Sequence, residues 1–206
     1  MARKTKIDAE KTRQAILNAA EMLFYEKGVS STSLGDIAEY AGLTRGAIYW
    51  HFKNKVELFD AMHRRIRLPL EAVLEASLHH EDPIRSLRDY WIHAVQELIN
   101  DDSKRRILEI VFRKCEYVRE FEGSVYRLQE WTRSTIIAMT DVFSEAKQMN
   151  ILREGISPEI AAKSTYSLIV GVIFTWILPQ SVDELQDTLP QILTVYFDSL
   201  RQPTLA

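Results

Sequence analysis

The sequence predicts an all-α protein, in which an N-terminal three-helix helix-turn-helix domain is joined to a larger helical domain. Apolar residues recur at helical spacing along most of the 206 residues, whereas the alternating pattern of a half-buried strand is nearly absent. Seven glycines and six prolines are spread thinly, so no loop-rich region interrupts the helices. We place the two predicted domains at residues 1–55 and 56–206.

The first predicted helix ends at Gly28, because glycine adopts the positive φ that often follows a helix. This helix is expected to cover the motif that follows, since two short helices bury too little apolar surface to fold alone. Its apolar side is formed by Ile16, Leu17, Ala20, Leu23 and Phe24.

Residues 33–59 have the layout of a helix-turn-helix, which places one helix in the major groove of DNA. Ser33 and Asp36 form a capping box at the start of a short helix. Gly42 permits the tight turn after it, and Thr44 can cap the second helix. The apolar side of the short helix is formed by Leu34, Ile37, Ala38 and Ala41.

The second helix of the motif has an unusual outer face. Ile48 and Phe52 are four residues apart and are predicted to face inward, which leaves Arg45 and Tyr49 for DNA. Gly46 costs roughly 1 kcal/mol relative to alanine inside a helix, and it fits a backbone that approaches another surface closely. A role as half-buried packing residues stays open for Tyr49, Trp50 and His51.

A second capping pair, Asn54 and Glu57, opens a longer helix. Residues 2–6 form a basic arm that can reach phosphates or the minor groove. We predict that Arg45 and its neighbours contact bases, while the remaining residues mainly hold phosphates. The full predicted DNA-contacting set is Arg3, Lys4, Lys6, Thr32, Ser33, Thr44, Arg45, Gly46, Tyr49, His51 and Lys55.

These residues closely resemble the DNA-binding domain of the TetR family of bacterial repressors. The similarity lies in the Phe24–Gly28 helix end and in TRQAIL at 12–17, TSLGDIA at 32–38 and AGLTRGAIYWHFKNKVELF at 41–59. The opening MARKTK, the segment TRGAIYWHFKNK and residues 112–116 are similar to the AcrR-like branch, which represses multidrug efflux pumps. The resemblance implies a repressor that a small-molecule inducer releases from double-stranded operator DNA.

Charge and cysteine content fit this hypothesis. Residues 1–55 hold 9 basic and 6 acidic side chains, a net +3, and the remainder holds 17 and 23, a net −6. A basic end on an acidic body is typical of a DNA reader attached to a domain with another task. The single cysteine, Cys115, excludes an intrachain disulfide, and the N-terminus lacks the apolar run of a signal peptide. The stretch 166–178 is too short for a bilayer, which takes about 20 residues, so we expect a cytoplasmic protein with no membrane contact.

The second half continues as predicted helices. Pro83 and Pro158 suit the first turn of a helix, after the capping residues Asp82 and Ser157. The apolar stripes predict helices over 84–98, 107–115, 125–143, 160–178 and 185–200.

Residues 160–178 are apolar almost all round, so this helix must be buried on every side. One flank can pack within its own subunit, and the other needs a partner. With the last helix, at 184–200, it could form a face that meets its copy in a four-helix bundle. A buried central helix of a monomer is the alternative. The helix-turn-helix favours the homodimer, because repressors of this type read two half-sites.

The resemblance also implies a ligand pocket among the helices that follow Lys55. Phe112 is placed on the same apolar stripe as Ile107. For any single candidate, ordinary core packing is the favoured alternative to ligand binding. Glu116 could neutralise a cationic ligand or form a surface salt bridge. The ligand-binding candidates are Ile66, Leu70, Leu108, Phe112, Trp131, Thr135 and Tyr166.

No catalytic motif stands out, and the five histidines lack metal-binding spacing with the lone cysteine, so we expect no enzyme activity, no cofactor and no metal. The leading hypothesis is a repressor of a multidrug efflux operon, released by a lipophilic molecule with or without a positive charge. A TetR-type regulator of another small-molecule response is the closest alternative. Two further classes are a helical enzyme or small-molecule carrier, and an architectural DNA protein without a sensor.

Overall fold

The computed structural model describes residues 6–66, 77, 78, 80–115, 121–177 and 182–203, and the predicted all-α fold is confirmed over these ranges. Helices account for nearly all of the regular structure in this part of the chain, and the only β-type pairing within it is an isolated bridge between Leu152 and Arg201. No helix of these ranges is long and apolar enough to cross a membrane.

The chain divides into two compact units. The first unit contains residues 1–67 and 102–126, and the second contains 68–101 and 127–206. The helices numbered α4 and α7 therefore pack with the helix-turn-helix. The predicted division into functional domains at residues 55 and 56 stays a prediction, because compactness does not test it.

The first unit is built around one long helix. Its core joins apolar residues of the helix-turn-helix to residues of the later helices, including Phe24, Ile37, Ile48, Phe52 and Ile110. The elements are α1 (Lys6–Lys27), α2 (Leu34–Tyr40), α3 (Arg45–His51), α4 (Lys55–His63), the 3₁₀ turn η1 (Arg64–Ile66), α7 (Asp102–Glu109) and the π turn η2 (Ile110–Lys114).

The predicted helix boundaries of the helix-turn-helix are confirmed. Gly28 and Gly42 have φ values of +84° and +63°, which glycine adopts without steric cost. Ser33 and Asp36 form the reciprocal capping box, and Thr44 caps α3. These bonds fix the turn between α2 and α3 by local contacts alone.

Two local predictions need correction. Asn54 Oδ1 accepts from the Glu57 amide at 2.8 Å as expected, but Glu57 Oε2 accepts from the amide of Lys53 instead of Asn54, also at 2.8 Å. Phe112 does not share the buried stripe of Ile107, because the π turn shifts the register of the side chains after Glu109, and 42% of Phe112 is exposed.

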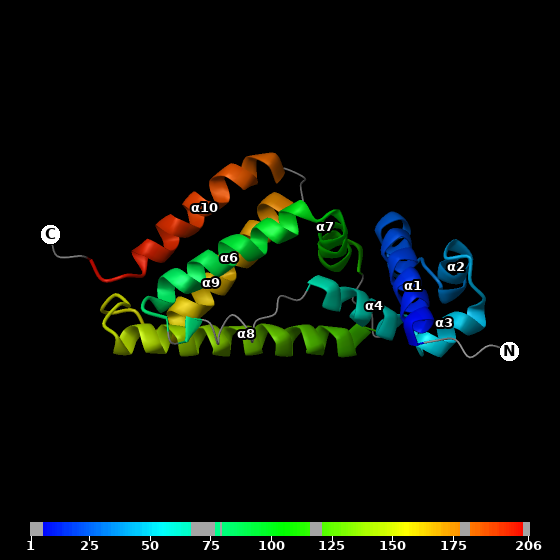
Figure 1. Cartoon of the computed structure of the whole chain (residues 1–206), viewed down its shortest axis with the longest axis horizontal. Coiled ribbons are helices and arrows are strands. Elements are labelled where there is room, and N and C mark those ends of the chain that lie inside the picture. Colours follow the sequence, from blue (N-terminus) through cyan, green and yellow to red (C-terminus); the bar gives the residue numbers. More distant parts are fainter. Residues whose placement is uncertain (1–5, 67–76, 79, 116–120, 178–181, 204–206) are drawn as a thin grey trace. The chain divides into compact units, whose positions relative to one another are not determined.

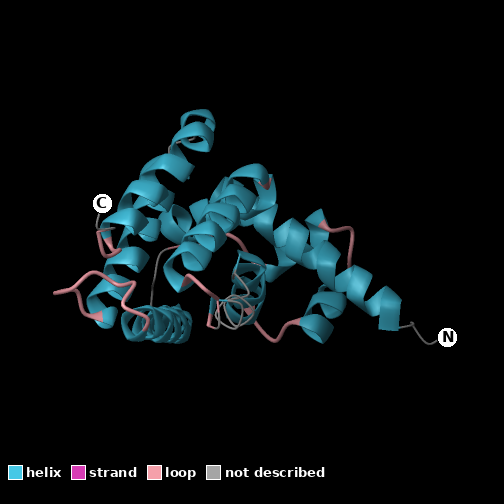
Figure 2. Ribbon diagram, turned by 60° about the vertical axis from the view of Figure 1, so that its left-hand side comes forward, coloured by secondary structure: helices cyan, strands magenta, loops and turns pink. Residues whose placement is uncertain are grey.

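The second unit is an assembly of long helices, in which α6 and α10 lie side by side (Figures 1 and 2). Asp82 and Ser157 cap α6 and α9, and Pro83 and Pro158 occupy their first turns, as predicted. The elements are α6 (Pro83–Asn100), α8 (Glu122–Gln148, which starts within the first unit), α9 (Pro158–Val172), the π turn η4 (Ile173–Ile177) and α10 (Val182–Ser199).

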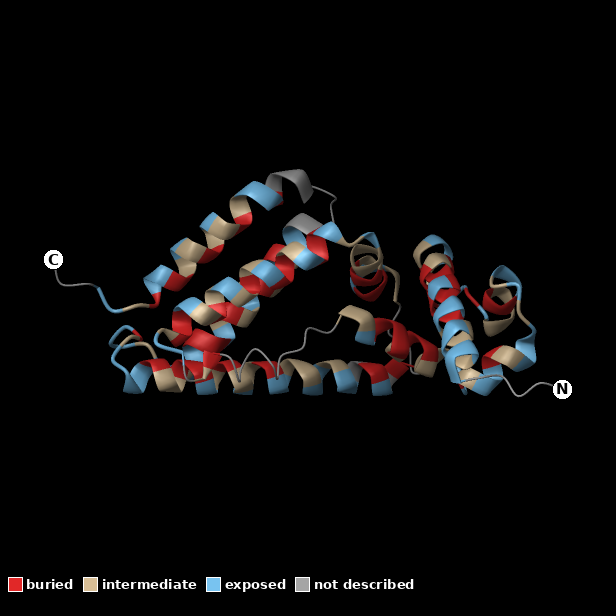
Figure 3. Ribbon diagram, viewed as in Figure 1, coloured by how far each residue is buried: buried red, intermediate tan, exposed pale blue. Residues whose placement is uncertain are grey.

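Burial in α9 and α10 is one-sided (Figure 3). Ala161 and Ile169 of α9, and Leu193 of α10, are buried in the second unit. The opposite side leaves Phe174, in the π turn η4 directly after α9, and Val195 of α10 exposed to 55% and 72%. Among the described residues, this side of the two helices therefore keeps apolar side chains exposed.

Candidate nucleic-acid interface

Helix α3 is anchored by its inner face and exposed on its outer face. Ile48 and Phe52 are 0% and 1% exposed in the core, as predicted. Tyr49 and Trp50 are 59% and 72% exposed, so the structure excludes a packing role for Trp50 within the first unit. Thr44 Oγ1 accepts from the Ala47 amide at 3.2 Å, which holds the first turn of the helix. The outer face is thus a rigid platform with aromatic and basic side chains.

Arg45 lies against the neighbouring helix of the motif. A Cβ atom added to Gly35 would lie 3.1 Å from Nε and Nη2 of Arg45, so glycine leaves room for the guanidinium beside α2. The pKa of Asp36 is lowered mainly by the hydrogen bond from the Ser33 amide, with help from the Ser33 hydroxyl and a smaller effect of Arg45. The sequence pattern does not reveal this role of Gly35, because the role depends on a side chain ten residues away.

A polar groove of about 360 Å³ adjoins α3. Lys55 Nζ donates to the carbonyl oxygens of Val29 and Ser30 at 3.0 and 3.3 Å, which fastens the loop after α1 to the start of α4. Hydroxyls and ammonium groups together suit a phosphate oxygen. We call this the serine–lysine groove, and its lining is Ser30, Ser31, Thr32, Ser33, Leu34, Tyr49, Lys53, Asn54 and Lys55.

The predicted DNA-contacting residues differ in exposure, and two of them lie outside the described residues. Thr32 is 1% exposed and its hydroxyl donates to Gly28 O at 2.8 Å, so this side chain holds the loop and its placement does not support a phosphate contact. His51 is half-buried, with its ring 4.5 Å from that of Trp50. Lys6 begins α1 and is exposed, whereas Arg3 and Lys4 lie outside the described residues. Ser30, Ser31 and Lys53 join the groove without having been predicted.

The ligand-binding candidates fall in both units. Leu108 is buried in the first unit, which also contains Ile66 and Phe112. In the second unit, the buried Thr135 hydroxyl donates to Trp131 O at 2.9 Å, and the Tyr166 hydroxyl pairs with Thr132 Oγ1 at 2.8 Å. Leu70 and Glu116 lie outside the described residues. A common pocket for the candidates stays a prediction.

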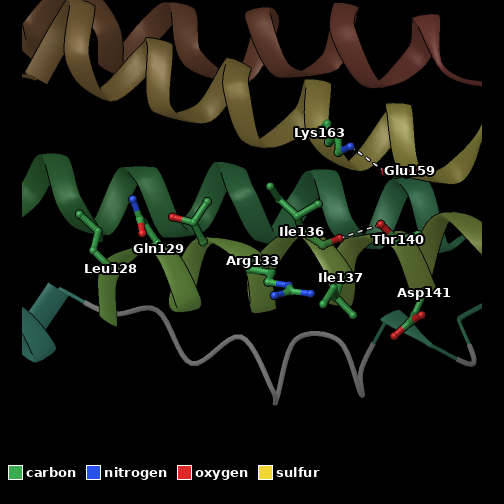
Figure 4. A pocket seen from close by; sticks show the side chains of 10 residues that line it. Leu128, Gln129, Arg133, Ile136, Ile137, Thr140, Asp141, Glu159 and Lys163 are labelled. Atoms are coloured by element: carbon green, nitrogen blue, oxygen red, sulfur yellow. Dashed lines mark hydrogen bonds and ion pairs between the residues drawn. The ribbon is translucent and has the colours of Figure 1, made fainter. Parts of the chain in front are cut away.

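A wide groove of about 720 Å³ runs along α8 in the second unit (Figure 4). Apolar side chains are interspersed with charged ones, and Lys163 Nζ lies 2.6 Å from Glu159 Oε1 at its edge. None of the predicted ligand residues lines it, although Thr132, the partner of Tyr166, does. Its lining is Leu128, Gln129, Thr132, Arg133, Ile136, Ile137, Thr140, Asp141, Glu159 and Lys163.

Two buried donors on α6 lack a partner among the described residues: the Tyr90 hydroxyl and Trp91 Nε1. Trp91 is 3% exposed, and the two rings are 5.3 Å apart. Burial, with a smaller effect of Glu97, raises the pKa of Tyr90 to about 12, so the hydroxyl keeps its proton. An unpaired buried donor costs about 1–3 kcal/mol, which an acceptor would recover. The apolar stripe of this helix gave no signal of that feature.

The chain matches known families over most of its length. The model of the tetR family of bacterial regulatory proteins matches residues 16–62, and that of the C-terminal region of MAATS-type transcriptional repressors matches residues 82–202. The HTH-type transcriptional regulator AcrR of Shigella flexneri is 36% identical over 218 residues, which cover 98% of both chains.

Two solved structures are similar across almost the whole chain. NalD, the secondary repressor of the MexAB-OprM multidrug efflux pump in Pseudomonas aeruginosa, has a TM-score of 0.88 and 39% identity, covering 97% of this chain and 100% of NalD. SmeT, the repressor of the Stenotrophomonas maltophilia pump SmeDEF, has a TM-score of 0.79 and 33% identity in its triclosan complex, covering 92% and 91%. With the helix-turn-helix geometry described above, these matches show that the chain belongs to the TetR family of bacterial regulatory proteins.

Proposed function

We propose that this protein is a homodimeric repressor of a multidrug efflux operon, which leaves its operator when a lipophilic molecule binds the second unit. The observation that supports it best is the outer face of α3 beside the serine–lysine groove, in a chain similar throughout to AcrR, NalD and SmeT. Members of this family are regulators and not enzymes. A regulator of another small-molecule response is the second candidate, because the same DNA-binding surface would serve it.

In this proposal, α3 enters the major groove and reads bases through Arg45, while Tyr49 and Trp50 contact the groove wall. Ser33, Lys53 and Lys55 line the serine–lysine groove and would bind a phosphate of the same strand. Because Lys55 is also bonded to the loop after α1, its position is fixed before DNA arrives. Such preorganisation lowers the entropy cost of binding.

The homodimer is proposed to form through α9 and α10. On α9 the exposed side runs from Ile160 through Ser167 to Gly171, and Phe174 of η4 continues it. A Cβ atom added to Gly171 would meet nothing within 4 Å, so a second helix could approach closely at the middle of this side. Val195 extends the apolar surface on α10. Two copies would form a four-helix seam and provide the two reading helices that a palindromic operator needs.

The proposed inducer is an apolar molecule with a hydrogen-bond acceptor. The Tyr90 hydroxyl and Trp91 Nε1 would gain a partner from its acceptor, and the apolar helices of the second unit would cover its body. Triclosan, which binds SmeT, has this chemistry in its chlorinated rings, ether and phenol oxygens. The inducer can weaken operator binding only as far as it prefers the conformation that does not fit DNA.

The test is a titration of the protein onto fluorescent DNA from the flank of its own gene, with and without triclosan. We expect tight, sequence-dependent binding that triclosan weakens, and an equal weakening of triclosan binding by the DNA. Binding that is tight but insensitive to triclosan and to a panel of lipophilic cations would contradict the efflux-inducer hypothesis and favour the second candidate. The absence of sequence preference would contradict the repressor hypothesis itself.

A further inference from the structure

Glu21 is a carboxylate buried inside the first unit, with only 4% of its side chain exposed. Arg106 Nε donates to Glu21 Oε1 at 2.9 Å, and Ser103 Oγ donates to Glu21 Oε2 at 2.6 Å. Arg65 Nη1 reaches the same Oε2 at 3.4 Å. Burying a carboxylate is costly unless it is paired and hydrogen-bonded, and these three donors supply that pairing. We call the four residues the Glu21 cluster.

The Glu21 cluster joins three elements that are distant in sequence. Glu21 lies on α1, Arg65 in η1 directly after α4, and Ser103 and Arg106 on α7. Arg65 is tied to α1 twice, because its Nη2 also donates to Gln14 Oε1 at 2.6 Å. Gln14 and Glu21, two turns apart on α1, therefore both bond to Arg65 directly after α4. The Glu21 carboxylate also bonds to α7.

The positions of these residues along the chain are informative. The chain passes between the two units after residue 67, after residue 101 and after residue 126. Arg65 lies two residues before the first crossing, and Ser103 lies two residues after the second. At two of the three crossings, therefore, a residue close to the crossing bonds to the same carboxylate of α1. Helix α1 in turn packs against α2.

We propose that Glu21 is the positioning residue through which the second unit and the operator-reading helices influence each other. A displacement of the chain at either crossing pulls on the same carboxylate, so it moves α1, and the core that α1 shares with α2 and α3 moves with it. This inference rests on the proposed repressor function, and it assigns the internal route by which that function is regulated. The simpler alternative is a static brace that holds the first unit together and transmits nothing.

The experiment uses the full-length protein and needs no identified inducer, because coupling is reciprocal and operator DNA can serve as the ligand. Hydrogen exchange is measured by mass spectrometry in the second unit, with and without a saturating duplex selected by the wild-type protein from the flank of its gene. The variants are Glu21→Gln and the matched control Glu26→Gln, which removes the same charge from an exposed position of the same helix. A further variant, Arg106→Gln, leaves Glu21 paired with Arg65 and serves if Glu21→Gln does not fold.

We expect the duplex to change exchange in α6, α9 or α10 of the wild-type protein and of Glu26→Gln. In Glu21→Gln saturated with the duplex, the duplex-induced change in hydrogen exchange should be smaller by at least about threefold. Arg106→Gln should show a smaller reduction. A static brace would lower the melting temperature but leave the change intact, and that result would overturn the inference. A wild-type protein that binds the duplex with no response in the second unit would overturn it too. If no duplex is selected at all, the proposed function fails first, and this inference fails with it.

Discussion

Replacing the two lysines of the serine–lysine groove should have different effects, because their contacts differ. Lys55 Nζ donates to Val29 O and Ser30 O, whereas Lys53 is exposed and uses its backbone amide, which alanine retains, to bond Glu57. Lys53→Ala is therefore expected to remove a phosphate contact only. Lys55→Ala is expected to remove a phosphate contact and also to release the loop after α1.

The magnitudes follow from these contacts. Each phosphate contact adds about 0.9 to the magnitude of the slope of log K against log salt concentration. Because a dimer carries each substitution twice, Lys53→Ala or Lys55→Ala should reduce this magnitude by about 2. The two bonds of Lys55, one part-buried and one exposed, are expected to contribute about 1–2 kcal/mol to the free energy of unfolding. In a chain of 206 residues, this corresponds to a fall in melting temperature of about 2–8 °C, and Lys53→Ala should cause almost none.

The assays are salt-dependent fluorescence anisotropy with operator DNA and calorimetry at a fixed protein concentration, because the stability of a dimer depends on concentration. Glu26→Gln serves as a control for a charge change outside the groove. An unchanged salt slope in both lysine variants would refute phosphate binding in the groove. Equal melting temperatures of Lys53→Ala and Lys55→Ala would refute the structural role of the Lys55 bonds.

Arg45→Ala should weaken operator binding by about 1–3 kcal/mol and relax base preference, and competition with altered operators would show an unchanged preference if α3 were misplaced. Val195→Glu, at an exposed position of the free chain, should give folded monomers in sedimentation, because the seam would bury an unpaired carboxylate; an intact dimer would move the interface elsewhere. Trp91→Phe removes one unpaired donor and replaces the indole with a smaller aromatic ring, so triclosan affinity should fall about fivefold by calorimetry, and an unchanged affinity would place the ligand elsewhere. The raised pKa of Tyr90 means that the unfolded chain loses its proton near pH 10 and the folded chain near pH 12, so stability should fall between these values, and Tyr90→Phe should lessen the fall.

The features that the sequence predicted well are those with local causes. Gly28, the Ser33–Asp36 capping box, Gly42 and Thr44 determine helix ends through contacts within four residues, so their pattern can be read along the chain. Apolar spacing likewise identified the buried sides of α1, α6 and α10. The helices and turns of the helix-turn-helix could therefore be predicted from the sequence without any tertiary contact.

The features that the sequence did not predict depend on distant partners or on small register changes. Arg65 and Arg106 are 44 and 85 residues from Glu21, and nothing in the local pattern pairs them. The Thr32 hydroxyl donates to Gly28 O, a contact that the spacing did not reveal, and a phosphate contact of Thr32 stays a prediction. Phe112 does not lie on the buried face of α7, because the π turn η2 shifts the register of the side chains. Each case requires knowledge of which segments meet, which spacing does not provide.

Because α1 is long, a small displacement at the Glu21 cluster could alter operator binding. At 22 residues this helix is about 33 Å long, so a rotation of about 5° displaces its far end by about 3 Å. Helix α3 has seven residues and is too short to hold its own position, so it must follow the core that it shares with α1. Two reading helices must match half-sites about 34–36 Å apart, and a mismatch of a few ångströms breaks contacts in at least one of them. A modest preference of an inducer for one arrangement of the Glu21 cluster would therefore be enough to shift operator occupancy, in proportion to that preference and no further.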